Sequence, residues 1–128
     1  MNIDTFKKCI ASAHEDYFSW NENYFCPYFQ EDVRITHAGW EHIMGIPRSR
    51  IQKYWRAKNL LYVPVILKKT TTVQKETRKH SSSGIQRLWS FVSIENGNIL
   101  EVVIRQIGNQ PKHFYSFVYK GIAPRIIS

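Results

Sequence analysis

The stretch IQRLWSFVSIENGNILEVVIRQIG, residues 85–108, decides the fold. Two runs rich in β-branched and aromatic residues flank Asn96-Gly97, a dipeptide typical of a two-residue hairpin turn because both central positions need positive φ. A third such run, HFYSFVYK, follows a longer turn over Gly108–Lys112. Before the first run, residues 70–77 read TTTVQKET, which alternates like a strand, and the polar segment KHSSSG then forms a flexible link. We therefore predict about four antiparallel strands over residues 70–120.

The chain before this sheet has a helical period. Apolar side chains recur at three-four spacing between residues 3 and 18, after a cap at Asn2 or Asp4. Residues 49–69 predict a further helix, begun by Ser49, and Pro64 breaks it into two near Tyr62 because proline lacks the N–H that the helix interior needs.

The segment between these helices is less regular. Residues 21–32, which include Pro27, predict a loop, and residues 33–36 predict a short strand or an extended entry to one or two helical turns in HAGWEHIMG. The sequence thus predicts one α+β domain over residues 1–128, with N-terminal helices (about 1–69) packed on a C-terminal antiparallel sheet of about four strands.

Charge is the strongest compositional signal. Lys and Arg number 18 against 10 Asp and Glu, which gives a net charge of +8. A field of that sign attracts phosphate backbones before contact, so we expect a polyanionic partner, RNA above all. The chain has no apolar run long enough to span a membrane, and its start lacks the pattern of a signal peptide. Two cysteines without CxxC spacing favour a reducing compartment, so we expect a cytoplasmic protein without a membrane partner.

Histidine and cysteine spacing argues against a metal site. His37 and His42 are five positions apart, which places their rings roughly 140° apart on a helix. Neither HExxH nor CxxC occurs, and GxSxG is absent too. We expect no metal, no cofactor and no serine-histidine nucleophile pair.

His42 is the main acid-base candidate. Imidazole is the side chain whose ordinary pKa suits proton transfer near neutrality, and Trp40 and Ile43 around it suggest a half-buried ring aimed at a cleft. The alternative, a core histidine bonded to backbone, stays open.

The last predicted hairpin carries polar residues in apolar strands. Arg105 follows Val103 and Ile104, the turn ends with Lys112 and His113, and Ser116 interrupts an aromatic run. Arg105 could clamp a phosphate with two hydrogen bonds, with Lys112 and Ser116 as further phosphate contacts. The alternative is a solvent-facing Arg105 paired with Glu101 on the same face of its strand.

Other polar residues are candidates for nucleic-acid binding. The predicted helix after Ser49 presents a basic face, and the polar segment after it sets hydroxyl and amide groups beside positive charge, although β-propensity alone explains those threonines. The candidates are Arg50, Lys53, Arg56, Lys69, Thr72 and Gln74.

The segments EDVRITHAGWEHIMG, KKTTTVQKET and LEVVIRQIGNQPKHFYSF resemble a group of small bacterial and phage proteins that fit the barnase, EndoU, colicin and RelE class of ribonucleases, several of them toxins of toxin–antitoxin systems. The resemblance implies metal-independent RNA cleavage by attack of the ribose 2′-OH. It implies His42 as the acid-base residue, His113 as a second one, and the polar residues of the last hairpin, Arg105, Lys112 and Ser116, as phosphate contacts. It also implies an acidic antitoxin or immunity protein as partner. No carboxylate base of the barnase kind is evident, since only Glu41 and Glu76 are available.

Two other functions fit the same charge. A non-catalytic nucleic-acid-binding module would use the basic helix after Ser49, although no helix-turn-helix, zinc-finger or RNA-recognition signature occurs. A small interaction protein would use that helix to bind an acidic protein surface.

Overall fold

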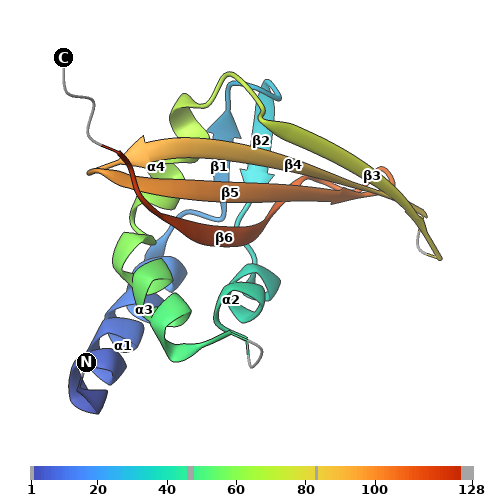
Figure 1. The fold of residues 1–128 in the computed structure, drawn as a ribbon. Coiled ribbons are helices and arrows are strands. Elements are labelled where there is room, and N and C mark those ends of the chain that lie inside the picture. Colours follow the sequence, from blue (N-terminus) through green and yellow to red (C-terminus); the bar gives the residue numbers. More distant parts are fainter. Residues whose placement is uncertain (1, 46–47, 83, 125–128) are drawn as a thin grey trace.

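The computed structural model describes residues 2–45, 48–82 and 84–124, and within them the chain forms helices and strands in the α+β arrangement that we predict (Figure 1). In chain order these are α1 (Ile3–Ser19), β1 (Asn23–Cys26), β2 (Glu31–Arg34), α2 (His37–Met44), α3 (Arg50–Asn59), α4 (Tyr62–Lys69), β3 (Lys75–Ser81), β4 (Gly84–Glu95), β5 (Asn98–Ile107) and β6 (His113–Ile122).

The sheet has six strands, and the prediction of about four is wrong in this respect. Their order is β1-β2-β6-β5-β4-β3, and β2 runs parallel to β6 through the single pair Arg34↔His113, so the sheet is mixed. The predicted loop over residues 21–32 contains the antiparallel β1–β2 hairpin instead. Strands of four residues are too short to show a period, and Pro27 lies in the turn that joins them.

The central hairpin is confirmed. Asn96 and Gly97 have φ of 50° and 78°, the left-handed conformation that the turn between β4 and β5 requires. Strand β3 starts at Lys75 rather than at residue 70, and it continues to Ser81, so half of the predicted flexible link is paired with β4. The longer turn between β5 and β6 is where we expect it.

The helices also follow the sequence closely. The Asn2 side chain accepts hydrogen bonds from the backbone N–H groups of Asp4 and Thr5 and so caps α1. The predicted break separates α3 from α4. Pro64 lies in the first turn of α4, where its missing N–H breaks no helical hydrogen bond.

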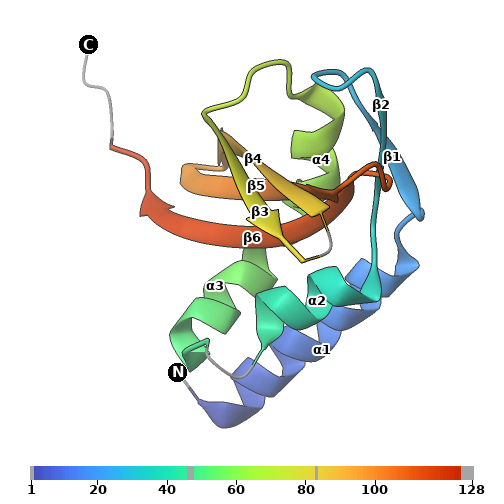
Figure 2. The same cartoon turned by 90° about the vertical axis from the view of Figure 1, so that its right-hand side faces the viewer.

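Helix α4 lies within the curve of the sheet, and α1, α2 and α3 lie together below β6 (Figure 2). Alternate residues of β4 and β5, among them Trp89, Phe91 and Val102, are buried and join the buried face of α4 in one hydrophobic core. The opposite face of these strands carries Leu88, Ser90 and other half-buried residues. Because side chains alternate between faces, the two surfaces have different chemistry.

Strand β6 contains the irregularity that shapes the site. Its pairing with β5 steps from Ile104↔Phe114 to Val103↔Ser116, so Tyr115 has no partner and forms a β-bulge. Phe114 and Phe117 therefore both face the core although they are three positions apart. Helices α2 and α3 contact β6 along the part of its edge that β2 leaves unpaired.

Among the described residues, no helix combines the length and the apolar character that crossing a bilayer requires.

Candidate functional site

The bulged Tyr115 brings together the two sequence-predicted residues His42 and Arg105. The His42 ring, from α2, stacks on the Tyr115 ring with a centroid distance of 4.1 Å and an interplanar angle of 29°. The guanidinium carbon of Arg105, from β5, lies 4.2 Å from the same centroid. Two groups this close to one centroid must occupy the two faces of the ring. Tyr115 thus fixes an imidazole and a guanidinium relative to each other.

Arg105 is held by His113 as well. Its Nε donates a 2.9 Å hydrogen bond to Nε2 of His113, directly across the strand pair. An arginine can only donate, so this ring nitrogen carries a lone pair. Burial and the charge of Arg105 lower the pKa of His113. His113 is therefore a neutral acceptor that orients Arg105, and its Nε2 is engaged in that contact.

His42 is half-buried, and its ring lies near several arginines. Burial, then the charges of Arg48, Arg56 and Arg105, lower its pKa below the ordinary histidine value of 6.5. Nη2 of Arg48 lies 3.4 Å from Nε2 of His42. That distance is long for a hydrogen bond, so the lone pair of Nε2 is only weakly engaged in the neutral ring.

Two arginines fix the helix end that carries His42. Arg48 Nε donates to the His42 carbonyl (3.4 Å), and Arg56 Nη1 donates to the Ile43 carbonyl (3.3 Å), so both satisfy carbonyls that the end of α2 leaves free. Arg56 is 4% exposed, and burial followed by the charge of Arg48 lowers its pKa to about 10. The assignment of Arg56 to an exposed nucleic-acid-binding face is therefore wrong, because α2 packs over that part of α3.

A pocket of about 260 Å³ opens beside the stacked rings on the sheet face opposite the core. Ser116, with 6% of its surface exposed, lies in the same wall. The lining residues are His42, Lys75, Thr77, Leu88, Ser90, Val103, Tyr115 and Ser116. None of these described lining residues is a carboxylate, and Glu41 and Glu76 are not among them. The pocket thus combines hydroxyl groups with the His42 ring and one cation, Lys75, which suits a phosphate group.

Several sequence-predicted contacts lie elsewhere. Lys112 forms an ion pair with Glu31 and lies over the rings of Phe29 and Trp89, on the core side of the sheet. Its side chain is correspondingly only 15% exposed, so the structure does not bring Lys112 to the pocket beside Tyr115, and its contact with phosphate stays a prediction. Lys69 forms an ion pair with Glu95.

The polar segment before β3 has a structural role at one position. The Gln74 side chain accepts a 2.6 Å hydrogen bond from the Val92 backbone, while Thr72 is exposed. Arg50 and Lys53 lie on the other side of α2 from the pocket: Arg50 covers the Phe6 ring, and Lys53 lines a groove beside α1.

The alternative pairing of Arg105 with Glu101 does not occur, since Glu101 forms its ion pair with Lys120. In residues 2–45, 48–82 and 84–124, no group of three or more His, Cys, Asp or Glu side chains is arranged to hold a metal ion.

The sequence pattern does not indicate three residues of the pocket, which are Tyr115, Lys75 and Thr77. Strand alternation offers a signal for Tyr115, because it stands two positions after His113, which faces Arg105 across the strands. Lys75 and Thr77 pair with Ser90 and Leu88, so their place in the pocket depends on a register that the sequence alone does not fix.

No protein-family model matches this chain, and neither do curated proteins or solved structures. A proposal of function therefore depends on the fold and on the pocket beside Tyr115. They define an α+β protein whose pocket suits a phosphate-bearing ligand.

Proposed function

We propose that this protein is a metal-independent endoribonuclease that acts from the pocket beside Tyr115. The observation that supports it best is the fixed arrangement of a neutral imidazole, His42, and a guanidinium, Arg105, on the two faces of one tyrosine ring. A base and a cation held this way match the two needs of RNA cleavage, which are removal of the 2′-OH proton and stabilisation of negative charge on phosphorus.

His42 acts as the general base in this proposal. Its lowered pKa keeps the ring neutral near pH 7, and its Nε2 takes the proton of the ribose 2′-OH. The 2′-oxygen then bonds to the adjacent phosphorus, the bond from phosphorus to the 5′-oxygen breaks, and a 2′,3′-cyclic phosphate remains. DNA lacks the nucleophile and is not a substrate.

Arg105 stabilises the charge that develops on the phosphate oxygens. Its Nε is bound to His113, which leaves the terminal N–H groups of the guanidinium to reach a ligand. Arg48, 3.4 Å from His42, supplies a second cation to the same phosphate. Fixed donors of this kind cost little reorganisation during the reaction, which is why they are effective in catalysis.

Lys75 is the proton donor that we assign to the leaving 5′-oxygen. It is exposed and lines the pocket, and its ammonium group is a hydrogen-bond donor. We prefer this assignment to His113 as the second acid-base residue, because Nε2 of His113 accepts the hydrogen bond from Arg105 and burial lowers its pKa.

A cleavage assay tests the proposal. Purified protein is incubated with single-stranded RNA in excess EDTA, beside the same sequence as DNA and as 2′-O-methyl RNA. We expect cleavage of the RNA alone, with 2′,3′-cyclic phosphate or 3′-phosphate ends. Loss of cleavage in EDTA would point to a metal-dependent reaction, and inactivity of the folded protein on total cellular RNA would reject the ribonuclease.

One observation favours a second function, a non-catalytic RNA-binding module. The pocket sets one cation, Lys75, and a stacked tyrosine together without any carboxylate among its described lining residues, and this composition serves binding as well as catalysis. Retention of RNA without cleavage would select this function. In either case two further proposals stand: a cytoplasmic location, which the two cysteines without CxxC spacing favour, and an acidic inhibitory partner, which the resemblance to toxin ribonucleases implies.

A further inference from the structure

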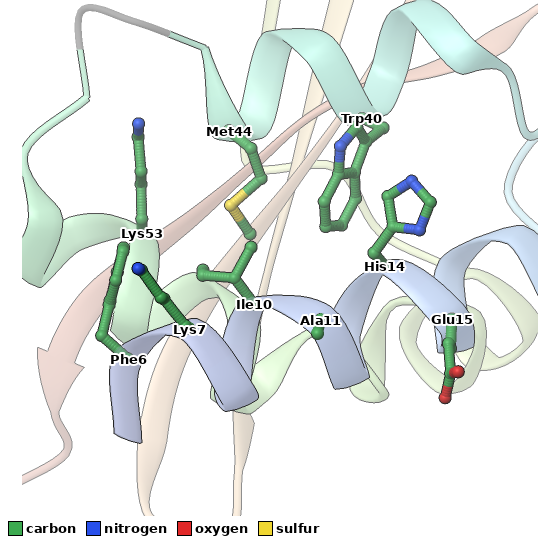
Figure 3. Close-up of a pocket in the computed structure, with 9 residues that line it drawn as sticks. All are labelled: Phe6, Lys7, Ile10, Ala11, His14, Glu15, Trp40, Met44 and Lys53. Carbon is green, nitrogen blue, oxygen red and sulfur yellow. The ribbon is translucent and has the colours of Figure 1, made fainter. Parts of the chain in front are cut away.

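A second cavity lies on the other side of α2 from the candidate site. It is a groove of about 640 Å³ along α1, closed on its far side by the end of α2 and the start of α3 (Figure 3). Its volume is in the range of small-molecule sites, and nothing in the proposed ribonuclease uses it. The lining residues are Phe6, Lys7, Ile10, Ala11, His14, Glu15, Trp40, Met44 and Lys53.

The floor of this groove is apolar. Ile10 from α1 faces Met44 and Trp40 from α2, and Ala11 is too small to fill the space between the helices. Methionine adapts its shape to what it contacts, so Met44 can repack around a bound chain. From Phe6 to His14 the groove follows α1 for about 12 Å, at 1.5 Å per residue.

Positive charge is confined to one end. Lys7 and Lys53 both stand at the Phe6 end of the groove, whereas Glu15 lies at the other end and points away from it (Figure 3). Arg50 adds a third cation there, with its guanidinium carbon 5.5 Å from the Phe6 ring centroid. None of the ion pairs formed among the described residues uses Lys7 or Lys53, so both charges are available to a ligand.

We propose that this groove binds an anionic amphiphile, with its head group between Lys7 and Lys53 and its hydrocarbon chain along Ile10, Met44 and Trp40. Cations at a single end above an apolar floor match one anionic head and one apolar tail. An acidic peptide helix, whose charges repeat along its length, would meet cations at one end only. The proposal does not depend on the proposed ribonuclease.

Calorimetry with laurate below its micelle concentration tests this site. We expect saturable binding at one site per chain, and each CH₂ removed from the chain, as in decanoate, should weaken it roughly fourfold. Dodecyltrimethylammonium, with the same tail and the opposite charge, should bind at least tenfold more weakly. Methyl NMR should place the largest laurate-dependent shifts at Ile10 and Met44.

Matched variants locate the head group and the tail. Lys7→Glu/Lys53→Glu should lower laurate affinity at least tenfold, whereas Lys8→Glu/Lys58→Glu, the same charge change on the same two helices outside the groove lining, should not. Ala11→Trp should block binding by filling the groove while the melting temperature stays close to that of the parent.

Three results would overturn the proposal: equal affinity for the cationic amphiphile, affinity that does not depend on chain length, or unchanged binding by the Lys7/Lys53 variant. Tight binding of a designed three-turn peptide with leucines on one face and glutamates at its C-terminal end, without binding of laurate, would also overturn it and assign the groove to a protein partner.

Discussion

Replacing Arg105 with alanine tests whether this residue acts in catalysis or only stabilises the fold. The substitution removes a 2.9 Å hydrogen bond to His113, worth about 1.5–3 kcal/mol for a charged donor, and the contact with Tyr115, worth about 0.5–2 kcal/mol. Part of this loss is offset, because Arg105 and His113 are only half-buried, so water can replace Arg105 as the donor to His113. We therefore expect a net destabilisation of about 1–3 kcal/mol.

That loss leaves most of the protein folded, since domains of this size are commonly stable by about 5–15 kcal/mol. The loss of a fixed cation at a reacting phosphate costs a factor of about 10²–10³ in rate. Urea unfolding and single-turnover cleavage of a labelled RNA, measured on the same preparation, give both quantities. Arg87→Ala is the matched control, because Arg87 is a half-buried strand arginine that does not line the pocket. A variant that melts much earlier but cleaves at the parental rate would show that Arg105 is only structural.

The other expectations concern proton transfer and charge. His42→Ala should lower the cleavage rate by about two to four orders of magnitude, and added imidazole should restore part of it; a parental rate would remove His42 from the mechanism. Lys75→Gln should slow cleavage of an ordinary RNA more than cleavage of one whose leaving group needs no proton, such as a p-nitrophenyl ester, and equal effects on both substrates would contradict its role as acid. Because the pKa values of His42 and His113 are lowered on folding, the folded state resists protonation, so the free energy of unfolding should fall as the pH drops below 6.5. Urea titrations at pH 7.5 and 5 measure this, and a His42→Gln/His113→Gln variant should show a smaller fall. The acid limb of the cleavage rate should likewise have its midpoint below pH 6.5. RNA affinity should decrease steeply with salt, as counterion release requires, and an affinity unchanged up to about 0.3 M salt would contradict the electrostatic argument.

Local signals in the sequence predict much of the fold. The Asn96-Gly97 turn, the Asn2 cap and the break before Pro64 each depend on residues a few positions apart, and all three are found. The β1–β2 hairpin and its parallel pairing with β6 depend instead on contacts between distant segments, through strands too short to show a period.

The same distinction applies to the site. His42, Arg105 and His113 stand out as polar residues in apolar surroundings, and the structure brings them together around Tyr115. The sequence predicts Arg56 on an exposed basic face, because helical periodicity shows which face is polar. It does not show that the end of α2 covers Arg56.

The parallel contact between β2 and β6 also constrains the order of folding. It joins distant segments of the chain: Lys112 and Glu31, which form an ion pair beside it, are 81 positions apart in sequence. Closing so long a loop is slow relative to forming a hairpin, so β3–β6 can form early and the N-terminal segment docks late. On the ribosome, a nascent chain in which α2 has been released but β6 has not yet been made cannot bring His42 to Tyr115. The pocket therefore first exists only when synthesis has passed the last strand, and any activity it carries begins at that moment.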